Sequence, residues 1–81
     1  MKITVTAISK FRRYFPARTL EVDFPGRTLD EFLAWVREKY GLDVSDHKNL
    51  KITRNSFLAR DYGIELAEGD QVAFIPIVAG G

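Results

Sequence analysis

The stretch TLDEFLAWVREKYG, residues 28–41, decides the fold because it has the pattern of a long amphipathic helix. Thr28 with Glu31 three residues later is typical of a capping box, in which each side chain accepts a hydrogen bond from a backbone N–H of the first turn. Gly41 tolerates the left-handed conformation that ends many helices. The apolar residues recur at the spacing of one helical face: Leu29, Phe32, Leu33, Val36 and Tyr40. We therefore expect one helix that buries this face.

Segments on both sides of this helix alternate apolar and polar residues, as strands with one wet face do. Residues 2–6 and 19–24 precede the helix, and residues 50–53 and 72–75 follow it. The first two segments are predicted to pair antiparallel. Because one helix can cover only one face of one sheet, the order of elements predicts an α+β two-layer domain. A helix that crosses between strands of a mixed sheet fits the β-grasp fold.

The composition describes one small domain, residues 1–81, with 46% hydrophobic and 28% charged residues. The chain has no cysteine, which excludes disulfides, thiolate zinc sites and a cysteine persulfide. Twelve basic and eleven acidic residues leave a net charge of +1, so no overall field favours nucleic acid or a membrane as partner. The first residues alternate rather than form an apolar signal peptide, and we expect a cytoplasmic protein.

The segment KFRRYFPAR, residues 10–18, mixes basic and aromatic residues. Such a mixture can bind single-stranded nucleic acid, with Phe11, Tyr14 and Phe15 stacking on bases. We favour a solvated loop with partly buried aromatic side chains, because acidic residues elsewhere cancel the charge. The only histidine, His47, has no second ligand at metal spacing, so we interpret it as an ordinary surface residue and expect no metal site.

The final stretch, LAEGDQVAFIPIVAGG, carries a family resemblance. It resembles the C-terminal signature of the small ubiquitin-related sulfur-carrier proteins (ThiS-like and MoaD-like), of the type that forms the small subunit of molybdopterin synthase. The match is L..GD.VAF.P.VAGG, with the two glycines at the end of the chain. RYFPART, TLDEFLAWV and ITRN agree more weakly with other parts of the family pattern, so the resemblance covers the whole length.

The resemblance implies a role for the last two residues. Gly81 would be adenylated by a ubiquitin-activating-like adenylyltransferase that uses ATP, and then converted to a thiocarboxylate. Gly80 would let the reactive end enter the partner's channel, since a residue without Cβ gives a thin, adaptable chain. The chain itself has no GxxxxGK[ST] phosphate loop and no nucleophile arranged with its histidine. We therefore expect a carrier or a non-catalytic small subunit with no bound cofactor.

The family resemblance leaves several functions open. The leading hypothesis is sulfur donation to a pterin precursor, in complex with the large subunit of molybdopterin synthase. A carrier of the same kind could instead serve thiamine, tRNA thiolation, tungsten cofactor or another sulfur metabolite. A protein modifier joined to lysine, as ubiquitin is, belongs to a second class, and a β-grasp interaction module with an inert tail to a third.

The last strand and its tail predict the docking surface. Residues 1–76 are expected to form the body and residues 77–81 a flexible tail, because Pro76 lacks the N–H needed to continue a ladder. Ile75 and Ile77 are expected on the open face of the sheet, where no helix covers them. Leu58 or Phe57, after the turn at Asn55, is expected to extend this apolar patch.

Overall fold

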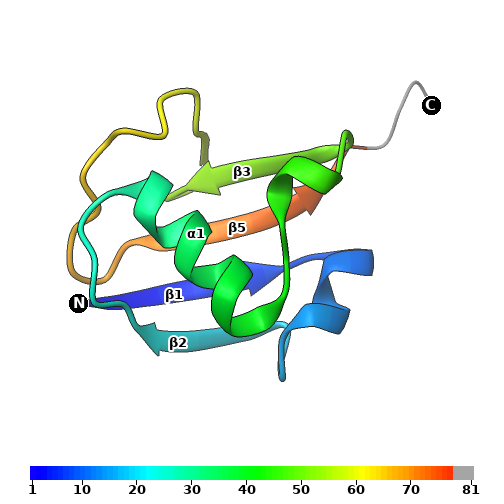
Figure 1. Ribbon diagram of the computed structural model, residues 1–81, viewed down its shortest axis with the longest axis horizontal. Helices are drawn as coiled ribbons and strands as arrows, with labels where there is room; N and C mark the ends of the chain where they lie inside the picture. Colours follow the sequence, from blue (N-terminus) through cyan, green and yellow to red (C-terminus); the bar gives the residue numbers. More distant parts are fainter. Residues whose placement is uncertain (78–81) are drawn as a thin grey trace.

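The computed structural model describes residues 1–77, which form a five-stranded mixed sheet and one long helix (Figure 1). The predictions for Gly80 and Gly81 lie outside these residues. The elements follow in the order β1 (Lys2–Ala7), the 3-10 helix η1 (Ser9–Tyr14), β2 (Thr19–Asp23), α1 (Leu29–Tyr40), the 3-10 helix η2 (Val44–Asp46), β3 (Leu50–Arg54), β4 (Phe57–Leu58) and β5 (Gln71–Pro76).

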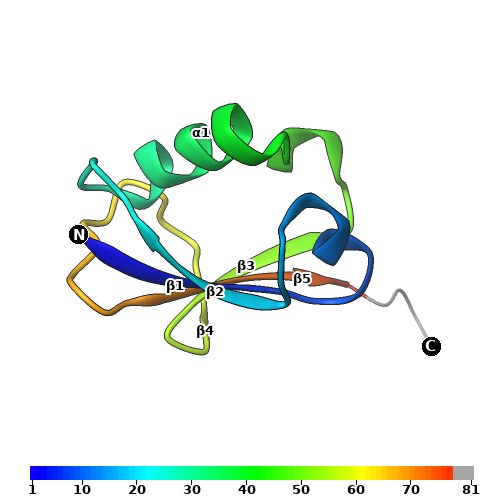
Figure 2. The ribbon, with the colours of Figure 1, turned by 90° about the horizontal axis from the view of Figure 1, so that it is seen from below.

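The sheet has the strand order β2-β1-β5-β3-β4 and confirms the predicted β-grasp fold. Strands β1 and β5 pair in parallel at its centre, with Val5 opposite Val72. The pair β1–β2 is antiparallel, as predicted, and β3 pairs antiparallel with both β5 and β4. Helix α1 lies on one side of the sheet, and the β3–β4 hairpin projects on the other side (Figure 2). The second face of the sheet is therefore left open.

Helix α1 has the predicted ends and the predicted buried face. The Thr28 hydroxyl accepts from the Glu31 backbone N–H at 3.2 Å, and the Glu31 carboxylate accepts from the Thr28 backbone N–H at 3.0 Å, which is a capping box. Gly41 ends the helix with a φ of +80°. Four residues of the apolar stripe are buried: Leu29, Phe32, Leu33 and Val36. The helix is thus held by local signals at its ends and by packing along one face.

Residues 10–18 were predicted to be a solvated loop with partly buried aromatic side chains, but most of η1 lies in this segment and two of its aromatic side chains belong to the core. Phe11 is fully buried and Phe15 almost so. The ring of Phe15 stacks on Phe74 of β5 at 5.8 Å and lies 4.9 Å from Tyr40 of α1, between centroids. The two phenylalanines fill the space between the end of α1 and the end of β5. They are therefore not free to stack on nucleic acid bases.

His47 was predicted to be an ordinary surface residue, and this prediction was wrong. The side chain is half-buried. Its ring packs edge-on against Phe11 at 5.2 Å and against Tyr14 at 6.0 Å. The imidazole therefore covers the aromatic residues of η1. In residues 1–77, no three histidine, aspartate or glutamate side chains gather as a metal site would require.

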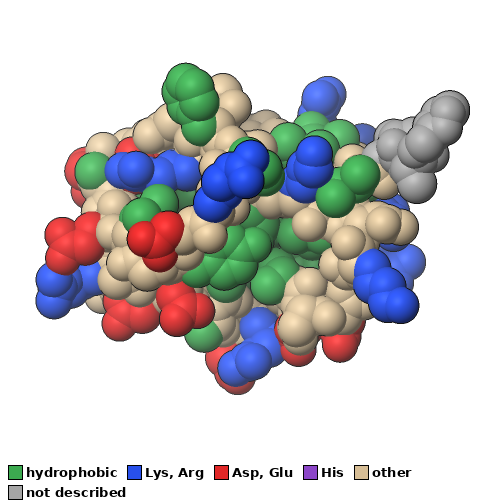
Figure 3. All heavy atoms as spheres, turned by 90° about the horizontal axis from the view of Figure 1, so that it is seen from above, with side chains coloured by type: hydrophobic (Ala, Val, Ile, Leu, Met, Phe, Trp, Pro, Cys, Tyr) green, Lys and Arg blue, Asp and Glu red, His purple; other side chains and the backbone are tan. Residues whose placement is uncertain are grey.

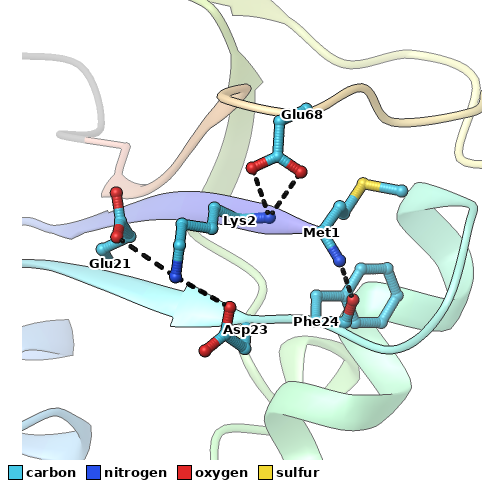
Figure 4. Close-up of polar contacts among 6 residues, drawn as sticks. All are labelled: Met1, Lys2, Glu21, Asp23, Phe24 and Glu68. Carbon is cyan, nitrogen blue, oxygen red and sulfur yellow. Dashed lines mark hydrogen bonds and ion pairs between the residues drawn. The ribbon is translucent and has the colours of Figure 1, made fainter.

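The first two residues form hydrogen bonds with the residue after β2 and with the turn before β5, the two strands that flank β1 (Figure 4). The Met1 ammonium donates a hydrogen bond to the Phe24 carbonyl at 2.7 Å. The Lys2 backbone N–H donates to both carboxylate oxygens of Glu68, at 3.1 Å each. The Lys2 Nζ lies 3.0 Å from an oxygen of Asp23. The exposed ion pair adds little to stability, whereas the backbone contacts fix β1 against the turn that precedes β5.

Candidate functional site

Strand β5 divides its side chains between the two faces of the sheet as predicted. Val72 and Phe74 are fully buried in the core beneath α1. Ala73 and Ile75 point to the open face and are half-buried. Ile75 lies opposite Lys51 of β3. The open face thus carries an apolar strip that follows the last strand.

A shallow hollow of about 330 Å³ lies on this open face. Ala73 and Ile75 of β5, together with Ile8, supply its apolar surface. The other residues that line it are small or uncharged: Thr6, Thr53, Ser56 and Gln71. Because no charged side chain lines the hollow, an apolar group of a partner can enter it without an ion being desolvated.

The described part of the last strand ends close to the expected position. Strand β5 ends at Pro76, and the Ile77 backbone N–H donates to the Asn49 carbonyl at 2.7 Å. The backbone is therefore held to the body one residue beyond the predicted end of the ladder. Ile77 is half-buried. Gly80 and Gly81, the predicted reactive end, lie outside the described residues.

The β3–β4 hairpin exposes two large apolar side chains, which line a second hollow of about 430 Å³ together with Ala59 and Ile64. Phe57 is 79% exposed and Leu58 is 42% exposed. The register places Leu58 opposite Thr53 and Phe57 opposite Arg54, so the two side chains leave opposite faces of the hairpin. Leu58 therefore lies on the same face of the hairpin as Thr53, which lines the hollow of the open face. Figure 3, which looks onto the β3 edge of the molecule, shows apolar side chains in the middle of this edge with charged side chains of both signs around them.

Asp70 is a structurally important residue that the sequence analysis missed. It is only 7% exposed, and its carboxylate accepts hydrogen bonds from Arg54 Nε at 2.9 Å, Asn55 Nδ2 at 3.0 Å and the Ala67 backbone N–H at 2.8 Å. Burial alone raises the pKa of Asp70, but the hydrogen bonds from Asn55, Ala67 and Arg54 outweigh it and hold the pKa below its ordinary value. The sequence shows only Gly69 followed by Asp70, a pair that is typical of a turn and does not reveal these partners.

These features suit protein binding. The open face offers an apolar strip and a hollow, and the β3–β4 hairpin exposes two apolar side chains at the edge of the sheet. No described helix is long and apolar enough to cross a membrane. A β-grasp domain with such a face beside its last strand has the architecture of a small ubiquitin-like carrier or modifier. The chain belongs to the ThiS family, whose model matches residues 9–81.

Solved structures of the same fold agree with this class. SAMP1 from Haloferax volcanii is 22% identical, with a TM-score of 0.76 and 100% of both chains covered. A putative molybdopterin converting factor, subunit 1, from Pyrococcus furiosus is 18% identical, with a TM-score of 0.80 over 95% of this chain and 98% of the other. A chain in a Helicobacter pylori complex of molybdopterin-converting factor subunits 1 and 2 is 23% identical, with a TM-score of 0.71 and 100% of both chains covered.

At these identities the likeness establishes the fold alone. The Helicobacter pylori structure is a complex of two subunits, so a protein of this fold does bind a protein partner. A search of curated proteins finds no match to this sequence.

Proposed function

We propose that this chain is a sulfur carrier protein, not itself an enzyme, that supplies sulfur for molybdopterin biosynthesis. In this proposal Gly81 is the reactive residue and Gly80 gives it access to a partner's active site. The observation that carries the proposal is the match to the ThiS family, which runs through residue 81. The apolar face beside β5, which leads toward that residue, supports it as a docking surface.

The chemistry requires an activating partner. The carboxylate of a C-terminal glycine has a pKa of about 3.3–3.7 and is therefore an anion and a poor electrophile at neutral pH. One of its oxygens attacks the α-phosphorus of ATP, and pyrophosphate leaves. Hydrosulfide then attacks the carbonyl carbon of this acyl adenylate, AMP leaves, and a proton is released. The product is a thiocarboxylate, and the ATP is bound and used by a ubiquitin-activating-like adenylyltransferase.

The docking partners follow from the same proposal. Ile75, Ile77 and Leu58 would contact the activating enzyme and then the large subunit of molybdopterin synthase, with Phe57 at the edge of the contact. Fully burying an exposed isoleucine contributes about 1.5–3 kcal/mol, and Ile75 and Ile77, which are already half-buried, would each contribute a part of this on binding. Because the activation consumes ATP, we place the reaction in the cytoplasm.

A protein modifier is the second candidate function. It is favoured by the similarity to SAMP1, which is described in a second structure from Haloferax volcanii as a small archaeal modifier protein. Activated Gly81 would then be joined to a lysine of another protein. A carrier for thiamine, tRNA thiolation, tungsten cofactor or another sulfur metabolite remains the third, with the same activation chemistry and a different acceptor.

Deleting Gly81 tests the proposed function. The truncated chain should keep the free energy of unfolding of the wild type, because a terminal residue contributes few contacts. It should not gain sulfur when it is incubated with the activating enzyme, ATP and sulfide. Intact mass spectrometry measures the replacement of one oxygen by one sulfur. The control is Ala34→Ser on the exposed side of α1, which should gain sulfur as the wild type does.

Two outcomes would contradict this proposal. Sulfur gain by the truncated chain would place the reactive group elsewhere. A ladder of conjugates on a denaturing gel, without a sulfur-bearing species, would favour the modifier over the carrier.

A further inference from the structure

The turn between β3 and β4 has an unusual backbone. Asn55 has a φ of +51° and Ser56 a φ of +74°. Two consecutive left-handed residues give the type of turn that joins tight hairpins, and glycine usually occupies at least one of the positions. Asparagine tolerates this conformation better than most residues, but serine has no such advantage. The turn therefore needs support from outside the hairpin.

The hairpin itself offers little of that support. Strand β4 has only two residues, and its ladder with β3 consists of Thr53 opposite Leu58 and Arg54 opposite Phe57. One further backbone bond follows, from the Ala59 N–H to the Ile52 carbonyl at 2.9 Å. Such a short ladder is marginally stable by itself. Because Phe57 is mostly exposed, its ring adds little packing to hold it.

The support comes from the start of β5. The Asn55 backbone N–H donates to the Gln71 carbonyl at 2.7 Å, and the Gln71 backbone N–H donates to Asn55 Oδ1 at 2.8 Å. The Asn55 side-chain amide is then fixed by the Asp70 carboxylate at 3.0 Å. The turn is thus joined to the last strand by both the backbone and the side chain of one residue.

Asp70 holds this connection together. It is the one buried charged residue among residues 1–77. One carboxylate oxygen accepts from Asn55, and the other accepts from Arg54 Nε and the Ala67 backbone N–H. Asn55 and Arg54 come from the hairpin, whereas Ala67 lies in the turn before β5. A buried carboxylate with several donors is rigid, because any rotation would leave a desolvated oxygen without a partner.

We propose that Asp70 is a positioning residue for partner binding: it locks the β3–β4 turn onto β5 and presents Phe57 and Leu58 in one fixed orientation before the partner arrives. This inference rests on the proposed function, in which the partner is the activating enzyme. The same lock places Ser56 and Gln71 at the rim of the hollow on the open face. A preformed surface loses less conformational entropy on binding than a mobile one.

Amide hydrogen exchange in the free protein tests the lock directly. Asp70→Asn keeps the size of the side chain but replaces one acceptor oxygen by a donor and removes the charge. We expect the amides of Asn55 and Ala59 to exchange about tenfold faster than in the wild type, with the amides of β1 unchanged, because the hairpin opens locally. Unchanged exchange at both amides would overturn the proposal.

The matched control is Glu68→Gln, an acid-to-amide change in the same turn. The Glu68 carboxylate accepts from the Lys2 backbone and has no bond to the hairpin. This variant should leave the exchange of Asn55 and Ala59 as in the wild type. If Asp70→Asn does not fold, Asn55→Gly takes its place, since glycine accepts the left-handed turn and only the side-chain link to Asp70 and Gln71 is lost. The exchange rate at Ala59 is then the deciding measurement.

A double-mutant cycle tests the link to binding. Calorimetry with the activating enzyme would give dissociation constants for the wild type, for Asp70→Asn, for a hairpin variant that carries both Phe57→Ala and Leu58→Ala, and for the variant with all three changes. We expect Asp70→Asn to weaken binding about fivefold, and the variant with all three changes to bind no more weakly than the hairpin variant, since Asp70 acts through these two side chains. Fully additive losses would overturn the proposal.

The two measurements separate this inference from the proposed function. If the wild type did not bind the activating enzyme at all, the proposed function would fail, and the exchange experiment would still decide whether Asp70 locks the hairpin. If the wild type bound and Asp70→Asn bound equally well, the carrier function would stand and the positioning role would fall.

Discussion

Gly26 is a position at which the core leaves no room for a side chain. A Cβ placed on this residue would lie 2.4 Å from the Cζ atom of Phe24. The Phe24 ring is buried and packs edge-on against Phe32 at 5.0 Å. The ring would therefore have to move out of a well-packed cluster to accept even a methyl group.

We predict that Gly26→Ala lowers the free energy of unfolding by about 1–3 kcal/mol, as overpacked core substitutions do. Urea denaturation measures this change. Gly63→Ala is the control, because its Cβ would meet only the end of the Asp61 side chain, at 3.3 Å. Equal unfolding midpoints for the two variants would show that the Phe24 ring adjusts without cost.

The lowered pKa of Asp70 predicts that the contribution of this residue to the free energy of unfolding depends on pH. Although burial raises its pKa, hydrogen bonds from Asn55, Ala67 and Arg54 lower the pKa below the ordinary value of 3.8. A carboxyl group whose pKa is lower in the folded state stabilises the fold above its unfolded pKa, and the contribution is lost as the pH falls through the folded pKa. Asp70→Asn should therefore be less stable than the wild type at neutral pH. The difference should shrink as the pH falls below 3.8.

Urea denaturation of both proteins at neutral pH and at several acidic pH values measures that difference. Glu68→Gln serves again as the control, because Glu68 lies outside the buried network. If the difference in free energy of unfolding between the wild type and Asp70→Asn stayed constant down to the lowest pH, the charge of Asp70 would not stabilise the fold.

At the scale of the elements, α1 depends on the side chains that it buries. Phe32 is fully buried in contact with Phe24 and Trp35. We predict that Phe32→Ala costs about 3–5 kcal/mol of unfolding free energy, because it removes a large apolar side chain and leaves a cavity. Glu38→Ala, on the exposed side of the same helix, should change the free energy of unfolding by less than about 0.5 kcal/mol. A melting temperature lowered by only about one or two degrees in Phe32→Ala would mean that this face is not core.

The elements that could be predicted are those specified by a local pattern within their own sequence. The capping box and Gly41 define the ends of α1 within a single segment, and its stripe requires only helical spacing. The strands likewise follow from alternation. The 3-10 helix η1 has no such local pattern. Phe11 and Phe15 are buried because α1 and β5 leave a space that they fill, and this space exists only in the assembled fold.

The residues of the candidate site could likewise be predicted from the sequence only in part. The open-face position of Ile75 follows from alternation along one strand. The role of Asp70 could not be predicted locally, because its partner Arg54 lies on β3 and its partner Asn55 in the turn that follows β3. An aspartate in a glycine turn is ordinarily solvated. The sequence also left Phe57 and Leu58 as alternatives, whereas the register of β4 places Leu58 on the same face of the hairpin as Thr53.

At the scale of the whole molecule, the open face should determine partner binding. We predict that Ile75→Asp keeps the fold and weakens binding to the activating enzyme or to the large synthase subunit tenfold or more, about 1.4 kcal/mol. The fold should tolerate the change because Ile75 is half-exposed and Lys51 lies opposite it. Calorimetric titration gives both affinities. Ala34→Asp introduces the same charge on α1, away from the open face, and should bind as the wild type does; equal affinities for Ile75→Asp and wild type would place the docking surface elsewhere.

The parallel pairing of β1 with β5 also bears on how the protein is made. Its register joins Thr4–Ala7 to Gln71–Phe74, so the centre of the sheet brings together segments from opposite ends of the described chain. Contacts between residues so distant in sequence form slowly and late in folding. A growing chain on the ribosome therefore lacks its central strand until Phe74 has been synthesised. Prematurely terminated chains would leave β1 and β3 with unpaired edges, open to proteolysis and aggregation. Only chains that have been synthesised through Phe74 can therefore reach a partner with a complete sheet.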